Sequence, residues 1–146
     1  MVIDHVGIVV AKLPEAIRRW TDLFGYRQIT EIVTNTRQQV RVVFLEKENS
    51  LTIKLIEPAG PGSPVYKFAL KGGGLHHLCF KCEDVETEVA RLAASGLRVL
   101  TPPQPGEAFG NDKIAFVYAR ELGLNIELID TEAKAGRICV RDSRNR

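Results

Sequence analysis

The chain has 146 residues, of which 45% are apolar and 26% are charged. This length allows one well-buried core and is too short for two ordinary domains, and the composition is that of a globular protein. The net charge of +2 is too small to favour nucleic acid or an acidic membrane as the partner. No apolar run approaches the roughly 20 residues of a membrane span.

The first half of the chain reads as one strand, a helix and three more strands. Residues 3–10 alternate as a strand, directly from the N-terminus, so no signal peptide is expected. A helix is predicted at 14–24, because Pro14 suits a first helical turn and apolar residues then recur with the helical period. Strands are predicted at about 27–34, 39–45 and 50–56.

The second half repeats this order. Residues 59–73 are rich in proline and glycine around a short helix predicted at 64–70. A strand at 75–82, a helix at 85–95 and strands at 98–100, 113–118 and 124–130 follow. The segment "TPPQPGEAFGND" (101–112) is predicted to be a mobile lid, where Phe109, Asn111 and the following Lys113 could touch a ligand. The tail, 131–146, has weak periodicity and is expected to be loosely ordered.

The two halves are copies of one βαβββ unit. "DHVGIVV" from Asp4 aligns with "HHLCFKC" from His76, 72 residues further on, and Phe44 pairs with Phe116 at the same offset. Lys54 pairs with Glu127 at an offset of 73. We therefore predict a single α+β domain over 1–146. It comprises module one (about 1–58), a linker (59–73), module two (about 74–130) and the tail (131–146).

Strand alternation assigns four polar residues to one face of the sheet. If Val6 and Ile8 face the helix, His5 faces the opposite way, and the same parity turns His77, Lys54 and Glu127 inward. His76 corresponds to Asp4 and is predicted at the outer edge of its strand, outside the site. The side chains of Cys79 and Cys82 should point to opposite faces, and three cysteines without a disulfide framework favour reduced thiols in a cytoplasm.

Two imidazoles and a carboxylate on one side of a metal ion form a facial set that leaves positions open for substrate or water. His5, His77 and Glu127 are therefore the candidate metal ligands, and the ion could be Co, Mn, Ni, Zn or Fe. The alternative is two histidines of structural role and a solvated glutamate. A carboxylate within an apolar strand needs a partner, and either a divalent ion or Lys54 would serve.

Three stretches carry a resemblance to a known family: "IDHVGIVV", "SPVYKFALKGGGLHHLCF" and "AFVYARELGLNIELID". They resemble the vicinal oxygen chelate superfamily, and within it the methylmalonyl-CoA epimerases, alongside the glyoxalases. The resemblance covers Ile3 to Asp130. It implies paired βαβββ modules in a curved mixed sheet around a divalent ion, a small-molecule substrate that could be an acyl-CoA, and a homodimer.

The resemblance also assigns roles. It maps four ligand positions onto His5, Lys54, His77 and Glu127, although the family has glutamine or glutamate where this chain has Lys54. A protonated lysine cannot ligate a metal ion. The glutamate that acts as general base in the epimerases corresponds to Val42, which cannot accept a proton.

Three hypotheses follow from the sequence. The first is a metal-dependent isomerase, epimerase or lyase that works through an enolate next to a carbonyl, with Lys54 as the catalytic residue that moves the proton. The second is an iron(II) extradiol-type dioxygenase, in which His5, His77 and Glu127 bind iron and Lys54 is not a ligand. The third is a metal-free binding protein of the resistance type, in which Lys54 and Glu127 form a salt bridge.

Overall fold

The computed structural model describes residues 1–130, and the prediction for the tail falls outside them. The strands are β1 (Val2–Val9), β2 (Arg27–Gln28), β3 (Val33–Asn35), β4 (Val40–Glu46), β5 (Thr52–Pro58), β6 (Gly74–Cys82), β7 (Arg98–Pro105), β8 (Lys113–Ala119) and β9 (Leu124–Asp130). The helices are α1 (Leu13–Phe24), α2 (Tyr66–Leu70) and α3 (Val85–Ala94), with 3-10 turns η1 (Glu107–Phe109) and η2 (Arg120–Leu122).

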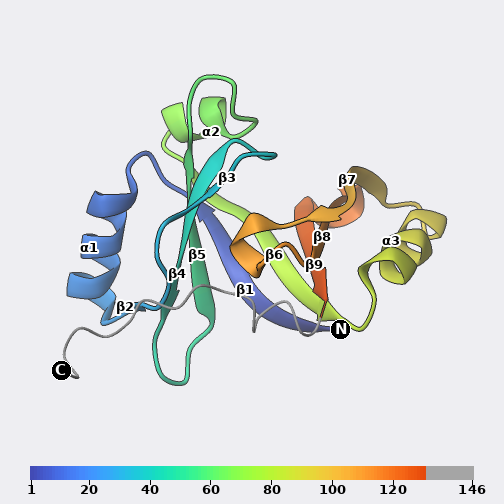
Figure 1. The fold of residues 1–146 in the computed structure, drawn as a ribbon, viewed down its shortest axis with the longest axis horizontal. Helices are drawn as coiled ribbons and strands as arrows, with labels where there is room; N and C mark the ends of the chain where they lie inside the picture. The colour runs from blue at the N-terminus through green and yellow to red at the C-terminus, as the bar shows by residue number, and fades with distance from the viewer. Residues whose placement is uncertain (131–146) are drawn as a thin grey trace.

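Within residues 1–130 all strands join one curved mixed sheet, as the sequence predicts for an α+β fold. The order is β2-β4-β5-β1-β6-β9-β8-β7, with β3 paired to β4. Each half contributes a contiguous set of strands, and the halves meet where β1 and β6 pair antiparallel at the centre. Figure 1 shows α1 and α3 at opposite ends of the molecule, and α2 contacts β5.

The register of the two halves follows the sequence repeat. β1 runs parallel to β5 and places Gly7 opposite Lys54, while β6 runs parallel to β9 and places Cys79 opposite Glu127. Gly7 and Cys79 are 72 residues apart and their partners 73. Lys54 and Glu127 therefore occupy equivalent positions, on strands that each neighbour the central pair.

Each long helix covers its own half of one sheet face. Val6 and Ile8 pack with the apolar side of α1, and Cys82 packs with Val85 and Val89 of α3. Burying one such side chain contributes about 1.5–3 kcal/mol. The opposite face of the sheet carries a third apolar cluster, which includes Phe44, Phe116 and Cys79. The predicted facing of the strands, including the separation of Cys79 from Cys82, is confirmed.

Helix ends also follow the sequence. The carboxylate of Asp84 accepts a hydrogen bond from the backbone N–H of Thr87 at 2.9 Å and caps the start of α3. Gly25 ends α1 with a φ of 71°, a left-handed conformation that favours glycine.

Two strand predictions were wrong. The predicted strand 27–34 is divided into β2 and β3, because the hydroxyl of Thr30 accepts the N–H of Phe44 and so replaces a ladder bond between main chains. The strand predicted at 98–100 continues to Pro105 as β7. Pro102 and Pro103 lack an N–H, but β7 is at the end of the sheet order, where one side of the strand needs no partner.

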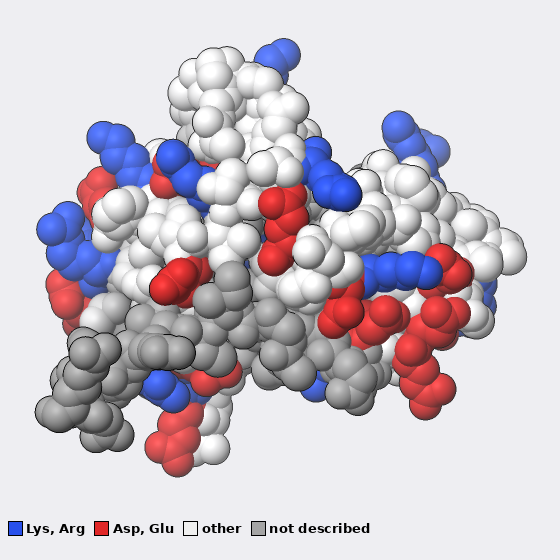
Figure 2. Space-filling model, viewed as in Figure 1, with Lys and Arg blue, Asp and Glu red and all other residues white. Residues whose placement is uncertain are grey.

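The surface does not carry a charge of one sign. Figure 2 shows lysine and arginine interspersed with aspartate and glutamate over the face in view. None of the helices in residues 1–130 has the length and apolar character required to cross a membrane.

Candidate active site

The four residues that strand parity assigned to one face meet at the centre of the sheet. His5 Nε2 lies 3.0 Å from Glu127 Oε2, and His77 Nε2 lies 2.9 Å from the same oxygen. The two Nε2 atoms are 3.3 Å apart. Lys54 Nζ lies 3.2 Å from Glu127 Oε1. All four side chains are buried on this one face, as the alternation of side chains along the strands predicts.

Three of these atoms form a compact triangle. His5 Nε2, His77 Nε2 and Glu127 Oε2 are separated by 2.9 to 3.3 Å. Neighbouring ligands of an octahedral ion, at bonds of about 2.1 Å, are about 3.0 Å apart, whereas tetrahedral ligands are about 3.4 Å apart. The triangle therefore has the size of one face of an octahedron. Because lone pairs converge there, a proton or a cation must lie between them.

Lys54 occupies the fourth position. Its Nζ contacts both carboxylate oxygens of Glu127, at 3.2 and 3.3 Å, and lies 5.4 Å from the ring centre of Phe109 and 5.9 Å from that of Phe44. At this place the ammonium group pairs with the carboxylate and makes cation–π contacts with both rings. The ammonium group of Lys54 therefore occupies the place beside the Glu127 carboxylate that a metal ion would otherwise take.

Two β-bulges bring further side chains into the site. In the β1–β6 ladder Asp4 is skipped between Ile3 and His5, and on the other strand His76 is skipped between Leu75 and His77. A bulge turns its extra residue away from the regular alternation. As a result, the carboxylate of Asp4 lies 2.8 Å from His5 Nδ1, and His76 Nδ1 lies 2.8 Å from His77 Nδ1.

The expectation that His76 lies outside the site was therefore wrong. The alternation of side chains between the two sheet faces holds along the regular part of β6 but fails at His76, the bulged residue. Each central histidine has the residue before it as the partner of its Nδ1, and those partners, Asp4 and His76, are equivalent in the repeat. Metal-binding histidines usually have such a second partner, which fixes the ring orientation.

Gly7 makes room for the ring of His77. A Cβ at this position would lie 2.2 Å from His77 Cε1 and 2.5 Å from both ring nitrogens. Gly7 and His77 are directly opposite in the β1–β6 ladder. The glycine of "DHVGIVV" is thus required by the close approach of an imidazole to the strand.

Aromatic rings line the two sides of the site. Phe44 packs edge-on to His5 at 5.3 Å, and its repeat equivalent Phe116 packs edge-on to His77 at 5.3 Å. Phe109 stacks on His5 at 6.2 Å and is 1% exposed. These rings exclude water from the polar centre, which strengthens the interactions between its charges.

Phe109 belongs to the segment that the sequence predicted as a lid. Instead of a solvated loop, this segment continues β7 and then forms η1, with Phe109 packed in the core. The carboxylate of Glu107 accepts hydrogen bonds from the N–H and the hydroxyl of Thr36, at 2.8 and 2.6 Å. Glu107 and Thr36 come from different modules, so this contact ties the two halves together beside the site.

Burial and charge set the protonation of the centre. Burial lowers the pKa of His77 to about 3, against the opposing effect of Glu127, so its imidazole is neutral and carries one proton. Burial alone would raise the pKa of Glu127. The charge of Lys54, together with His77 and the hydrogen bonds from both imidazoles, holds that pKa well below its usual value. Glu127 is therefore a carboxylate at neutral pH.

A cavity of about 250 Å³ adjoins this centre. Its polar residues are Gln38, Lys54, His76, His77 and Thr101. Its apolar residues are Val40, Val42, Ile56, Pro64, Leu100 and Phe116. Val42, at the position that the epimerase resemblance gives to the general base, thus lies in the cavity wall. Among the described residues, the titratable ones that line this cavity are Lys54, His76 and His77.

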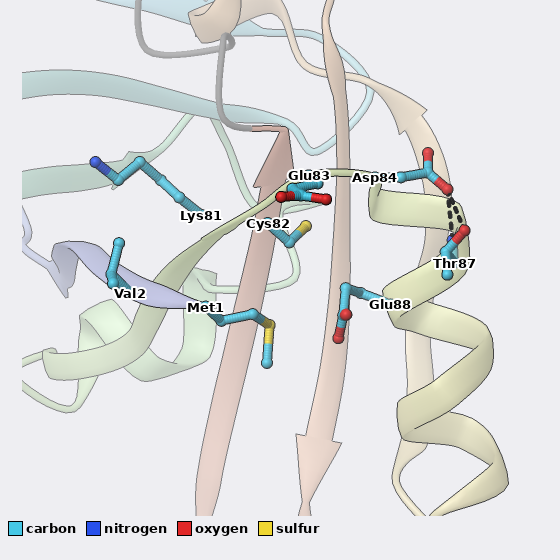
Figure 3. A pocket seen from close by; sticks show the side chains of 8 residues that line it. All are labelled: Met1, Val2, Lys81, Cys82, Glu83, Asp84, Thr87 and Glu88. Atoms are coloured by element: carbon cyan, nitrogen blue, oxygen red, sulfur yellow. Dashed lines mark hydrogen bonds between the residues drawn. The ribbon is translucent and has the colours of Figure 1, made fainter.

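A larger hollow, of about 550 Å³, lies away from this centre. Figure 3 shows it between the N-terminal residues Met1 and Val2, the end of β6 and the first turn of α3. Its acidic residues are Glu83, Asp84 and Glu88, and the Asp84 carboxylate is already engaged by Thr87. None of the central four residues lines it, so the smaller cavity is the candidate active site.

The donor set of the centre fits a divalent ion at three positions. His5, His77 and Glu127 offer two imidazole nitrogens and one carboxylate oxygen at the spacing of an octahedral face. Asp4 holds the His5 ring through its Nδ1 and leaves Nε2 directed at Glu127 and His77, where an ion would bind. Lys54 does not fit as a fourth ligand while it is charged. It lines the adjoining cavity, which gives its ammonium space to leave Glu127.

Comparison with known proteins decides the family. The sequence profile of the Glyoxalase/Bleomycin resistance protein/Dioxygenase superfamily matches residues 4–116. The chain belongs to this superfamily. Within the superfamily it is similar to the mitochondrial methylmalonyl-CoA epimerase of Dictyostelium discoideum, with 30% identity over 86% of this chain and 76% of that protein. It is equally similar, at 30% identity, to the ethylmalonyl-CoA/methylmalonyl-CoA epimerase of Cereibacter sphaeroides, over 86% of this chain and 95% of that one.

Solved structures of this superfamily have the same fold. The crystal structure of methylmalonyl-CoA epimerase from Mycobacterium tuberculosis matches with a TM-score of 0.76 and 32% identity, over 88% of this chain and 86% of that chain. A methylmalonyl-CoA epimerase in complex with methylmalonyl-CoA and NH4+ matches with a TM-score of 0.77 and 26% identity, over 93% of this chain and 96% of that chain. The resemblance drawn from sequence motifs is confirmed.

Proposed function

We propose that this protein is a divalent-metal-dependent isomerase or lyase of the epimerase type, which removes a proton next to a carbonyl and works through an enolate. The observation that carries the proposal is the triangle of His5 Nε2, His77 Nε2 and Glu127 Oε2, with its spacing of 2.9 to 3.3 Å. A divalent ion bound there supplies a Lewis acid that stabilises the negative charge of an enolate oxygen.

The substrate proposed is the acyl end of an acyl-CoA of the malonyl type. Two of the similar proteins are named for ethylmalonyl-CoA or methylmalonyl-CoA. A cavity of about 250 Å³ is smaller than the roughly 300–1,000 Å³ of sites that enclose a drug-sized ligand. It therefore suits the acyl group alone, with the remainder of the molecule outside.

Lys54 is the proposed proton carrier. Val42 offers no proton acceptor, whereas Lys54 lies in the cavity wall and contacts the carboxylate that would become a ligand. A cation next to an amine favours its neutral form, because two positive charges a few ångströms apart in a buried site repel. Lys54 would then leave Glu127 and accept the substrate proton, while the apolar wall keeps water from the enolate.

A second candidate function is favoured by the same residue. Charged Lys54 is held by the Glu127 carboxylate and two aromatic rings, which is a complete arrangement without any ion. In that case the protein would be a metal-free binding protein for an anionic or aromatic small molecule.

One experiment separates the two candidates. The protein, stripped with a chelator and reloaded with cobalt or manganese, would be incubated with methylmalonyl-CoA in D2O. The proposal expects deuterium at the α-carbon at a rate that depends on the added ion, with Lys54→Met abolishing the exchange and retaining the ion. Failure of the protein to bind either ion, combined with calorimetric binding of the thioester, would instead support the metal-free binding protein.

A further inference from the structure

The segment "SPVYKFALK" (63–71) borders the cavity from the outside and has no part in the polar centre. Pro64 lines the cavity and is itself exposed, so it lies at the cavity mouth. At the other end of the segment, Lys71 precedes β6, the strand that carries His76 and His77. The segment, which contains α2, therefore forms part of the rim of the candidate active site.

The two sides of this segment differ in character. Val65 and Ala69, four residues apart, are buried in the apolar cluster below the site. Lys67 and Lys71 are also four residues apart, lie on the other side of the helical turn and are exposed. Packing on the core explains the buried side of α2 but does not explain two lysines on the exposed side.

The two lysines are not engaged by carboxylates. Within residues 1–130, neither Lys67 nor Lys71 forms an ion pair, whereas Lys54 and Lys113 each pair with a glutamate. Two ammonium groups on one side of a helical turn, with no carboxylate paired to them, are suited to a ligand with more than one negative charge.

Exposed apolar side chains accompany the lysines. Phe68 and Leu70 of α2 have exposed fractions of 36% and 71%, and Leu75 at the start of β6 has one of 57%. The ring centre of Phe68 lies 6.4 Å from that of His76, which lines the cavity. Exposed apolar side chains beside a pocket are typical of a ligand-binding surface. Phe68 thus extends the apolar wall of the cavity to the outside.

The connection from α2 to β6 fixes this surface in place. Residues 72–74 are three glycines, all with positive φ, which gives a sharp turn that other residues rarely adopt. Gly73 packs against the end of β1, where a Cβ would lie 2.2 Å from the carbonyl oxygen of Val9. Its N–H donates to the carbonyl oxygen of Phe68 at 2.9 Å. The exposed side of α2 is therefore held next to the strand that carries the site histidines.

We infer that the exposed side of α2 binds the diphosphate of an acyl-CoA, with Lys67 and Lys71 as its cationic partners and Phe68 beside the pantetheine arm. The inference rests on the proposed acyl-CoA substrate, whose acyl group alone fits the cavity. An acyl-CoA presents, in order, an acyl group, an arm with apolar methylene groups, and phosphates. The protein presents a cavity, exposed apolar side chains and two lysines in the same order.

Calorimetric binding of two thioesters to the metal-loaded protein tests the inference. Methylmalonyl-CoA and methylmalonyl-pantetheine share the acyl group and the arm, but the second lacks the phosphates and the adenosine. The double variant Lys67→Gln/Lys71→Gln should bind methylmalonyl-CoA about fivefold or more weakly than the parent, because two charge-assisted contacts are lost. Its affinity for methylmalonyl-pantetheine should not change, which also shows that the variant is folded.

Lys47→Gln is the matched control. Lys47 is exposed in the connection between β4 and β5, which Figure 1 shows at the opposite end of β5 from α2. This variant should bind both thioesters as the parent does. Equal affinity of the double variant and the parent for methylmalonyl-CoA, or an equal loss for both thioesters, would overturn the inference and leave the proposed function standing. Failure of the parent to bind either thioester would overturn both.

Discussion

Lys54 and Glu127 occupy equivalent positions in the two modules, and their charged groups meet at 3.2 Å across the centre of the sheet. This pair competes with any divalent ion for the same carboxylate. The competition is the main determinant of what the site can do, because an ion must displace an ammonium that is already paired and buried.

Replacement of Lys54 by glutamine should therefore tighten divalent-metal binding. Lys54→Gln removes the competing cation and provides an amide oxygen as a ligand, so the Kd for cobalt or manganese should fall at least tenfold, about 1.4 kcal/mol. Calorimetric titration of both forms measures this. An equal Kd for both would place Lys54 outside the coordination sphere, as the dioxygenase hypothesis requires, and absence of binding by either would favour the metal-free binding protein.

Substitution of Asp4 tests the orientation of His5. Asp4→Asn keeps the shape of the side chain but removes the charge that accepts from His5 Nδ1, 2.8 Å away. Loss of such a partner typically lowers metal affinity by about 10–100-fold. Titration with zinc would show the loss, and His5→Ala should lose binding altogether. An unchanged affinity for Asp4→Asn would mean that Asp4 has no part in presenting His5.

A methyl group at Gly7 should disable the site from the opposite strand. Gly7→Ala would place a Cβ 2.2 Å from the ring of His77, so the ring must rotate away from Glu127. We expect loss of metal binding and a lower melting temperature. Gly60→Ala is the matched control, since a Cβ there meets nothing within 4 Å, and it should preserve both properties. Normal zinc binding by Gly7→Ala would show that the strand can move to accommodate the methyl group.

The stripped protein should lose stability as the pH falls below about 6.5. The pKa of His77 is about 3 in the folded state, below its ordinary value of 6.5. The unfolded chain therefore takes up a proton before the folded one does, and stability present above 6.5 is lost down to about pH 3. For one proton the slope is at most about 1.4 kcal/mol per pH unit.

Urea unfolding at a series of pH values would measure this slope. The lowered pKa of Glu127 acts in the same direction but only below its ordinary value of 4.5, so the interval from 6.5 to 4.5 separates the two effects. His77→Gln should flatten the slope in that interval, whatever its effect on total stability. An equal slope in the variant would assign the loss to other groups.

A carboxylate at position 42 should increase proton exchange. Val42 lines the cavity at the position that corresponds to the epimerase base, so Val42→Glu would add a proton acceptor there, at some cost in stability from burial. In the metal-loaded protein, deuterium incorporation into methylmalonyl-CoA should rise at least tenfold. Val42→Leu is the control and should show no gain. The absence of a gain in a folded, metal-bound Val42→Glu protein would argue against an epimerase-type substrate.

Much of the site could be predicted from the sequence because a repeat constrains two strands at once. The match of Lys54 with Glu127, and of His5 with His77, needs only the alternation of side chains along regular strands. Asp4 and His76 were not found because a bulge breaks that alternation, and a bulge leaves no clear mark in a single sequence. The one signal present was a polar residue directly before each site histidine, at equivalent positions in the repeat.

Phe109 could not be predicted for a different reason. Its surroundings, rich in glycine and proline, indicate a loop, and local composition does not say whether a loop packs on the core. The contact of Glu107 with Thr36 joins residues 71 positions apart, and it fixes η1 over the site. Long-range contacts of this kind depend on the complete sheet.

The two modules pair through β1 and β6, and this pairing suggests a reason why the two modules are fused in one chain. Two identical half-length chains, paired about a true twofold axis, would place the same residue at both central positions. Two lysines there would repel, and so would two glutamates. When the two halves are fused into one chain, equivalent positions can hold different residues. One half then carries the ammonium of Lys54 and the other the carboxylate of Glu127. Likewise, one bulge carries Asp4 and the other His76. The asymmetry that this site needs is available to a covalently joined pair and not to a symmetric pair of identical halves.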